Sequence, residues 1–302
     1  MKSLNNVLAP AKLNLFLHIT GRRTDGYHLL QSVFMLIDWY DTLHFEVRAD
    51  GQISREDLNV PLPTDDLITR AARLLKQSTG SALGAHIAIE KSIPAQAGMG
   101  GGSSDAATCL LALNKLWGLG LSVKQLAELG LKLGADVPFF LHGHNAWVEG
   151  VGEIMTPISL PPAQFVVVKP SEGLETAKIF GSEALKRDTK PATISVFAAD
   201  PYGFGHNDLQ PVAQRLCPQI SDAIEWIESA KLEIAGLETT RLSSAVLKGR
   251  MTGSGSAVFA QVPRGTDLNQ MPQVPATWQN WKIRMCGNLE VHPQKGWASS
   301  DD

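Results

Sequence analysis

The chain has 302 residues, 44% of them hydrophobic and 19% charged, which is ordinary for a globular protein with room for two modest domains. Its formal net charge of −3 lacks the basic excess of a dedicated nucleic-acid binder. The three cysteines are far apart and odd in number, so they indicate neither a disulfide framework nor a metal site and favour a reducing cytoplasm. We expect neither a signal peptide nor a membrane span, because no apolar run approaches the roughly 18 residues that a span needs.

Hydrophobic periodicity predicts the first strand. Leucine or isoleucine occupies every second position from 13 to 19, which is typical of a strand with one buried face. The period of two places Lys12 and Asn14 together on the opposite face. The same reasoning predicts further strands at 33–37, 42–47, 146–148 and 164–169, and helices that begin near 67 and 122 and that span 220–234.

Composition suggests where the chain divides. The proline-rich interval from about 155 to 165 is typical of a crossover, so we expect an N-terminal domain at 1–158 and a C-terminal domain at 159–290. The tail, 291–302, has little to bury and is expected to be mobile. Residues 186–206 are rich in proline, threonine and glycine and are expected to form a loop. Because strands and helices mix without strict alternation, the predicted fold class is α+β.

The run from Pro94 to Ser104 is the most informative segment of the chain. It is rich in glycine and serine and lies between a strand-like stretch at 86–89 and an amphipathic helix. Glycines let backbone N–H groups approach a ligand closely, and the helix adds unpaired N–H donors and the positive end of its dipole. This combination favours a phosphate cradle over a flexible surface turn, the other interpretation of such a run.

Familiar phosphate motifs are absent from this run, so its design is different. The run is not a P-loop, because no Lys-Ser/Thr pair follows its glycines. It also lacks the third glycine of the dinucleotide-binding fingerprint, since Ser103 follows Gly102. A second glycine-rich element, 251–257, precedes the apolar stretch 258–262. Alone it is best explained as a tight strand entry; beside the first run, a contribution to a phosphate pocket is equally well supported.

Two charged residues allow a catalytic interpretation. Asp136 follows a helix and precedes Pro138, so it could cap a short helix or serve as the carboxylate that orients the attacking hydroxyl in phosphoryl transfer. Lys12 lies in an apolar run, which favours a buried role over the solvated charge that is commoner for lysine. His142 and His144 flank a glycine, but no third ligand is evident and they define no metal site.

Together these residues resemble the GHMP small-molecule kinases. The resemblance rests on Pro10-Ala-Lys12-Leu-Asn14, on Pro94 to Ser104 and on Met251-Thr-Gly-Ser-Gly255. Three further segments are similar to the members that phosphorylate a cytidine-diphosphate-linked sugar alcohol: Asp25-Gly-Tyr-His28, Gly134-Ala-Asp-Val-Pro138 and Val148-Glu-Gly-Val-Gly-Glu153. The likeness runs from about residue 8 to 170 and resumes at 207–209 and from 251 to about 290.

The resemblance implies a two-domain fold, with a ribosomal-protein-like nucleotide-binding domain and a ferredoxin-like substrate domain. It implies transfer of the γ-phosphate of ATP, bound with Mg²⁺, to the 2-hydroxyl of a diphosphocytidyl methylerythritol in non-mevalonate isoprenoid biosynthesis. The expected partners are therefore two small molecules in the cytoplasm, with no nucleic acid and no membrane. Metal ligands and oligomeric state do not follow from it.

The resemblance also implies site residues. Lys12 and Asp136 would be the catalytic pair, and Asn14 would help to position the substrate. The ATP phosphates would be held by Pro94, Ala95, Gln96, Ala97, Gly98, Met99, Gly100, Gly101, Gly102, Ser103 and Ser104. The cytosine would be sandwiched between two rings and hydrogen-bonded at its edge, by Tyr27, Phe180 and His28.

Some segments depart from the family pattern. The acidic residue in Asp65-Asp66-Leu67-Ile68 stands where the family usually has asparagine, which leaves an adenosine contact open. Residues 170–176 differ from the usual loop, and 218–250 is longer than typical. Two alternatives stay open: another GHMP kinase, acting on homoserine or mevalonate, and a non-catalytic nucleotide-binding sensor. The predicted base contacts argue against the first, and the presence of both Lys12 and Asp136 argues against the second.

Overall fold

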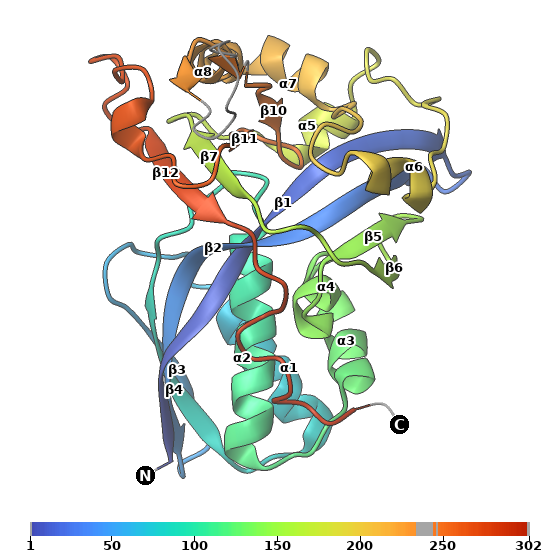
Figure 1. Ribbon diagram of the computed structural model, residues 1–302. Helices are drawn as coiled ribbons and strands as arrows, with labels where there is room; N and C mark the ends of the chain where they lie inside the picture. Colours follow the sequence, from blue (N-terminus) through green and yellow to red (C-terminus); the bar gives the residue numbers. More distant parts are fainter. Residues whose placement is uncertain (1, 234–243, 246, 301–302) are drawn as a thin grey trace.

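The computed structural model describes residues 2–233, 244–245 and 247–300. Two long strands, β1 (Ser3–Arg22) and β2 (His28–Arg48), pair antiparallel and run side by side through both halves of the molecule (Figure 1). The strands expected at 33–37 and 42–47 are therefore parts of one continuous strand.

The first half of the molecule is a six-stranded sheet with helices on one face (Figure 1). Its order is β3-β4-β2-β5-β6, with β1 paired to β2 outside this path. The other strands are β3 (Ile53–Asp57), β4 (Gly84–Glu90), β5 (Ala146–Glu149) and β6 (Ile154–Pro157). The helices are α1 (Leu67–Thr79), α2 (Gly101–Trp117), α3 (Val123–Leu131) and α4 (Val137–His142).

Several local predictions are confirmed in this half. Asp66 caps α1, which ends at Gly80 in the left-handed conformation. Ser122 and Gln125 form the expected capping box at the start of α3. The prediction of an amphipathic helix after the glycine-rich run is wrong in one respect: α2 is buried around nearly its whole circumference, because it lies between the sheet and the neighbouring helices.

The second half is a four-stranded antiparallel sheet of order β10-β11-β7-β12, with α7 and α8 sharing its apolar core. The strands are β10 (Arg250–Met251), β11 (Val258–Val262), β7 (Gln164–Lys169) and β12 (Lys282–Gly287). The helices are α5 (Thr176–Phe180), α6 (Ile194–Ala199), α7 (Gln210–Leu216), α8 (Gln219–Glu228) and the 3-10 turn η1 (Leu268–Gln270). A two-stranded ladder joins β8 (Leu232–Glu233) to β9 (Ser244–Ala245).

Two predictions in this half are corrected. The 186–206 stretch is not all loop, because Thr193 caps the short helix α6 and Phe197 of that helix packs into a core. The helix expected at 220–234 ends at Glu228. Ser229 takes the C-cap position, and its backbone N–H donates to the carbonyl of Glu225. Part of the long 218–250 stretch, 234–243 and 246, lies outside the described residues.

The strand β1 is buried on both faces rather than on one. Leu13 and Leu15 pack with Phe165 of the second sheet, while Val7 and Ala9 belong to the core under the helices. The expectation of one exposed face is wrong because this strand lies between the two halves of the molecule. Lys12 and Asn14 do share a face, but that face is enclosed as well.

The C-terminal tail contradicts the expectation that it has little to bury. In its described part, 291–300, His292 and Gln294 are buried, and the Lys115 ammonium lies 4.3 Å from the Trp297 ring centroid. The backbone N–H of His292 donates to the carbonyl of Gly143 at 2.9 Å. The tail thus returns to the first half and covers α2 and α4.

The chain passes from the first sheet to the second between Pro157 and Gln164, which is where the sequence places the boundary of 1–158 and 159–290. Whether these segments are independent folding units stays a prediction. Among the residues that the structure describes, no helix is long and apolar enough to cross a membrane.

Candidate active site

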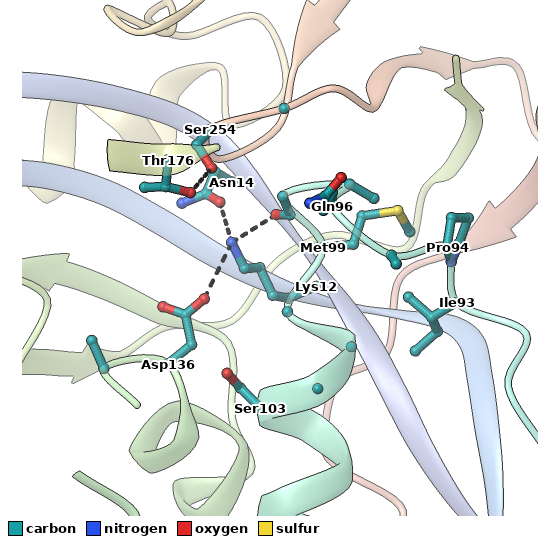
Figure 2. Close-up of a pocket in the computed structure, with 18 of the residues that line it drawn as sticks. Lys12, Asn14, Ile93, Pro94, Gln96, Met99, Ser103, Asp136, Thr176 and Ser254 are labelled. Atoms are coloured by element: carbon teal, nitrogen blue, oxygen red, sulfur yellow. Dashed lines mark hydrogen bonds and ion pairs between the residues drawn. The ribbon is translucent and has the colours of Figure 1, made fainter. Parts of the chain in front are cut away.

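A cavity of about 640 Å³ lies where β1, the glycine-rich run, the start of α4 and the 252–255 turn meet (Figure 2). Residues from both halves of the molecule line it, so the site is assembled from segments far apart in the chain. Most of the predicted site residues face it, namely Lys12, Asn14, Asp136, Phe180 and the run from Pro94 to Ser103. Three do not line it: Ser104, Tyr27 and His28.

Lys12 is the buried cation of the site. Its side chain is 4% exposed, and its Nζ donates to the carbonyl of Gly98 at 3.0 Å and to Oδ1 of Asn14. Oδ2 of Asp136 lies 3.7 Å from the same Nζ (Figure 2). Burial lowers the pKa of Lys12, and the charge of Asp136 partly restores it. The two hydrogen bonds fix the direction of the ammonium group, and at 3.7 Å the carboxylate of Asp136 compensates its positive charge only in part.

Asp136 takes the cap position of α4, but its side chain makes no capping hydrogen bond. The carboxylate instead points toward Lys12 and into the cavity, and it remains 34% exposed (Figure 2). Of the two interpretations of this residue, the cap explains its backbone position only. Its carboxylate is left available for chemistry.

Asn14 is held from three sides. Its backbone N–H donates to the hydroxyl of Thr252 at 2.8 Å, and its Nδ2 donates to the hydroxyl of Ser32 at 2.9 Å. Its remaining side-chain atom, Oδ1, accepts from Lys12. Through these bonds Asn14 orients the lysine and links β1 to the second glycine-rich turn.

The glycine-rich run is a packed structure rather than a flexible turn. The backbone N–H groups of Ser256 and Ala257 donate to the carbonyls of Gln96 and Ala97 at 3.1 and 3.2 Å. Gly98 has φ +71°, and a Cβ there would lie 2.2 Å from the carbonyl oxygen of Thr252. The second glycine-rich turn therefore braces the first, and its Ser254 and Gly255 also line the cavity.

The run leads directly into α2, which begins at Gly101 after Gly100 at the cap position. No side chain caps this helix, so its first N–H groups keep their hydrogen-bonding capacity for a ligand. Ser103 lies in the first turn and faces the cavity, whereas Ser104 is fully buried. We therefore expect no direct contact between Ser104 and a ligand in the cavity.

Sequence reasoning missed a charged cluster beneath this run. Lys91 donates to the carboxylates of Asp105, at 2.6 Å, and Asp41, and burial raises the pKa of Asp105 to about 8. Asp41 also accepts from the backbone N–H groups of Ser92 and Ile93, at 2.6 and 2.8 Å. The cluster anchors the entry to the glycine-rich run. An acidic residue directly after Ser103-Ser104 was the one available signal.

At the other end of the cavity the predicted base contacts are only partly brought together. The rings of His28 and Phe180 lie 5.1 Å apart, and Phe180 both lines the cavity and packs against the second core. Tyr27 is 64% exposed. Sequence reasoning also missed Arg187, whose Nε donates to Nε2 of His28 at 3.0 Å.

Asp66 lines the cavity but is engaged in the fold. Its carboxylate accepts from the backbone N–H groups of Ile68 and Thr69 and pairs with Arg55. Asparagine could make the same cap, so the ion pair with Arg55 is the contact that the acidic side chain adds at this position. Within the described part of the chain, no group of three or more His, Cys, Asp and Glu residues is placed to hold a metal ion.

Comparisons with known proteins agree with this geometry. A family model described as the GHMP kinases N terminal domain matches residues 66–144. The chain is 63% identical to the 4-diphosphocytidyl-2-C-methyl-D-erythritol kinase of Albidiferax ferrireducens, with 100% of this chain and 98% of the relative aligned. It is 58% identical to the kinase of the same name from Variovorax paradoxus, over 99% of this chain and 100% of that one.

Solved structures give the same result. The crystal structure of a 4-(cytidine 5'-diphospho)-2C-methyl-D-erythritol kinase superimposes with a TM-score of 0.73 at 31% identity, covering 95% of this chain and 99% of that chain. The Methanococcus jannaschii mevalonate kinase has a TM-score of 0.65 at 14% identity, over 95% and 98%, which shows a shared fold alone. The protein is therefore a kinase with the two-domain α+β GHMP fold, and it belongs to the family of 4-diphosphocytidyl-2-C-methyl-D-erythritol kinases.

Proposed function

We propose that this protein phosphorylates the 2-hydroxyl of 4-diphosphocytidyl-2-C-methyl-D-erythritol with ATP. The observation that carries the proposal is the pair formed by Lys12 and Asp136, 3.7 Å apart, beside an uncapped helix N-terminus and inside a cavity that reaches from the glycine-rich run to Phe180. Kinase names among the relatives supply the substrate class, and the pair supplies a means of transfer.

The glycine-rich run would bind the phosphates of ATP. Backbone N–H groups at the start of α2 donate to anionic oxygens, and the helix dipole adds a favourable potential. Phosphoryl transfer depends mainly on positioning and on charge neutralisation, which rigid backbone donors provide. The braces from the 252–257 turn hold these donors in place before ATP arrives.

The catalytic pair would act on the acceptor hydroxyl. Asp136 would accept or orient the proton of the 2-hydroxyl as the oxygen attacks the γ-phosphorus. Lys12 would stabilise the negative charge that develops on that oxygen and would hold Asp136 in position. The bond from Lys12 to Asn14 fixes the direction of the ammonium group, and Asn14 thereby helps to place the substrate.

Mg²⁺ is proposed to enter as part of the ATP complex rather than in a cage built by the protein. Magnesium in such sites takes one or two carboxylates, phosphate oxygens and water. In this proposal the phosphate oxygens and water supply the ligands, and the ion would neutralise charge on the phosphates. We further propose action in the cytoplasm on small molecules, with no nucleic acid or membrane partner; the three cysteines are free thiols.

A substrate panel tests the proposal. ATP consumption is measured with the cytidylated methylerythritol, with free methylerythritol, and with homoserine and mevalonate. We expect turnover with the cytidylated alcohol and little with the others. Preferred turnover of homoserine or mevalonate would reassign the protein within the GHMP kinases, and ATP binding without turnover of any alcohol would leave a nucleotide sensor.

A further inference from the structure

Arg187 connects the two side chains that are expected to contact the cytosine. Its Nε donates to Nε2 of His28 at 3.0 Å, and its Nη2 donates to the backbone carbonyl of Phe180 at 3.3 Å. The remaining bonds go to the carbonyls of Ser182, at 2.8 Å, and Leu185, at 2.9 Å. The guanidinium group therefore closes the chain segment after α5 into a compact turn and fastens the imidazole ring to it.

This arrangement determines where the proton of His28 lies. Arginine has donors only, so Nε2 of His28 must accept and the neutral ring carries its proton on Nδ1. Burial and the positive charges of Arg187 and Arg22 lower the pKa of His28, which keeps the ring neutral. Among the residues that the structure describes, Nδ1 of His28 has no hydrogen-bond partner, so its N–H remains free for a ligand.

A fixed N–H donor distinguishes the two pyrimidines. N3 of cytosine is an acceptor, whereas N3 of uracil carries a proton and would face the donor with another donor. A site built to hydrogen-bond one edge rejects the mismatched edge far more strongly than a stacking surface does. A ring free to exchange its proton between Nδ1 and Nε2 could satisfy either base.

We propose that Arg187 is a specificity-determining positioning residue, which sets the tautomer and the orientation of His28 so that Nδ1–H selects cytosine over uracil. This inference rests on the proposed function, because it requires a cytidylated substrate at this end of the cavity. Arg187 itself need not touch the base. It acts through His28. Its second bond, to the carbonyl of Phe180, holds the backbone of Phe180 in a fixed position relative to the imidazole ring.

The tautomer can be tested in the unmodified protein. A long-range ¹H–¹⁵N spectrum of the imidazole rings, with His28 assigned by its loss in His28→Ala, reports which nitrogen carries the proton. We expect Nδ1 of His28 to be protonated and Nε2 to be the bare, accepting nitrogen. A ring protonated on Nε2, or one that exchanges between both forms, would overturn the proposal without any question of folding.

The specificity role is tested by kinetics. We expect Arg187→Gln to lower the preference for the cytidylated over the uridylated alcohol by about tenfold or more, which corresponds to the loss of one well-placed hydrogen bond. The KM for ATP should stay unchanged. Arg187→Lys serves as a second variant that keeps the charge, and Lys186→Ala, at an exposed neighbour, serves as the matched control. A purely structural role would weaken both pyrimidine substrates alike and would leave their ratio unchanged.

A double variant shows whether Arg187 acts through His28. In His28→Ala, adding Arg187→Gln should change the cytosine preference no further, whereas independent roles would add. If the wild-type protein does not turn over the cytidylated alcohol at all, the proposed function fails and this inference fails with it. If the wild-type protein does so but the preference survives in Arg187→Gln, only the inference about Arg187 is wrong.

Discussion

The two ends of the cavity are built in different ways. At the phosphate end, which comprises the run 94–103 with Lys12 and Asp136, backbone groups and buried side chains hold one another in place. At the expected base end, Phe180 lines the cavity, the half-buried His28 and Arg187 adjoin Phe180, and the exposed Tyr27 precedes His28 in the chain. Under the proposed function, the transfer chemistry would depend on a rigid frame, whereas substrate choice would depend on a few side chains, of which Tyr27 and His28 lie outside the apolar cores.

The comparison makes opposite demands on substitutions. At the phosphate end a change that disturbs the packing of the glycine-rich run should lower ATP binding and stability together, because the same backbone atoms serve both. At the base end a change at the exposed Tyr27 should alter the KM of one substrate and leave stability nearly constant, whereas Phe180 also packs against the second core. Arg187 is the intermediate case, since it holds a turn and also orients a ring.

The largest effect is expected at the carboxylate of the catalytic pair. Asp136→Asn keeps the size of the side chain but removes the proton acceptor, so kcat should fall by about 10²–10⁴, the usual range for a positioned acid or base. The KM for ATP should change little, because in the proposed function the glycine-rich run holds the phosphates. Steady-state kinetics with both substrates measure this. Turnover close to that of the wild type would leave Asp136 with its backbone role at the start of α4 only.

Local patterns predicted much of the phosphate end. The strand ending at Glu90, the glycine-rich run and the helix after it follow one another in the chain, so their relation is encoded within about thirty residues. The pairing of Lys12 with Asp136 could be predicted only through the family resemblance. The ring contact of Arg187 joins positions 159 residues apart, and no local spacing announces such a contact.

Other misses have a similar cause. Residues 12–19 looked one-sided because alternation records the composition of a strand and not what packs against its second face. From the sequence, the tail at 291–302 is expected to have little to bury and to be mobile. It is nevertheless anchored by a buried histidine and by Trp297, whose partners lie on α2 and α4.

The second prediction concerns acid and the support behind the phosphate end. Burial lowers the pKa of His292 to about 3 from its usual 6.5. As the pH falls from 6.5 toward 3, the unfolded chain binds a proton at this ring and the folded protein does not, so stability present above pH 6.5 is lost. The loss approaches about 5 kcal/mol, at 1.36 kcal/mol per pKa unit.

The location of His292 makes this loss relevant to the comparison. The centroid of its ring lies 6.4 Å from that of Phe140, and a Cβ on Gly100 would lie 3.0 Å from the same phenyl ring. Urea unfolding between pH 7 and 4 should show a shallower pH dependence in His292→Gln than in the wild type. His86→Gln, at a side chain 35% exposed, is the control for loss of an imidazole. Identical slopes for His292→Gln and wild type would contradict the assignment.

The third prediction separates two glycines of the same run. Gly98→Ala combines a left-handed backbone, which costs an L-residue about 1–2 kcal/mol, with a close approach to the carbonyl of Thr252. We expect a lower melting temperature and a higher KM for ATP. Gly102→Ala is the matched control, because its Cβ would meet Leu67 at an ordinary 3.5 Å. Gly101→Val is a poorer test, since its Cβ would lie 3.0 Å from Ile93 and would disturb the fold as well as the phosphates.

If the glycine-rich run were a pliable turn, both alanine variants would behave alike. A wild-type melting temperature and a wild-type KM for ATP in Gly98→Ala would therefore show that contact between the two glycine-rich segments does not stabilise the phosphate end.

The smallest effect is expected at Tyr27, where the two ends of the cavity should differ most clearly. Its side chain is 64% exposed, so Tyr27→Ala removes little packing and should leave the melting temperature unchanged. Stacking on a base contributes about 1–3 kcal/mol, so the KM for the cytidylated alcohol should rise about tenfold or more while that for ATP stays constant. Phe180→Ala should show the same selective loss together with a lower melting temperature, because Phe180 also packs against the second core. Leu131→Ala, at a side chain 56% exposed, controls for loss of an exposed apolar group. An equal loss for ATP and for the cytidylated alcohol in Tyr27→Ala would show that this ring serves the whole cavity, and the division of the site into a rigid phosphate end and an adaptable base end would then be wrong.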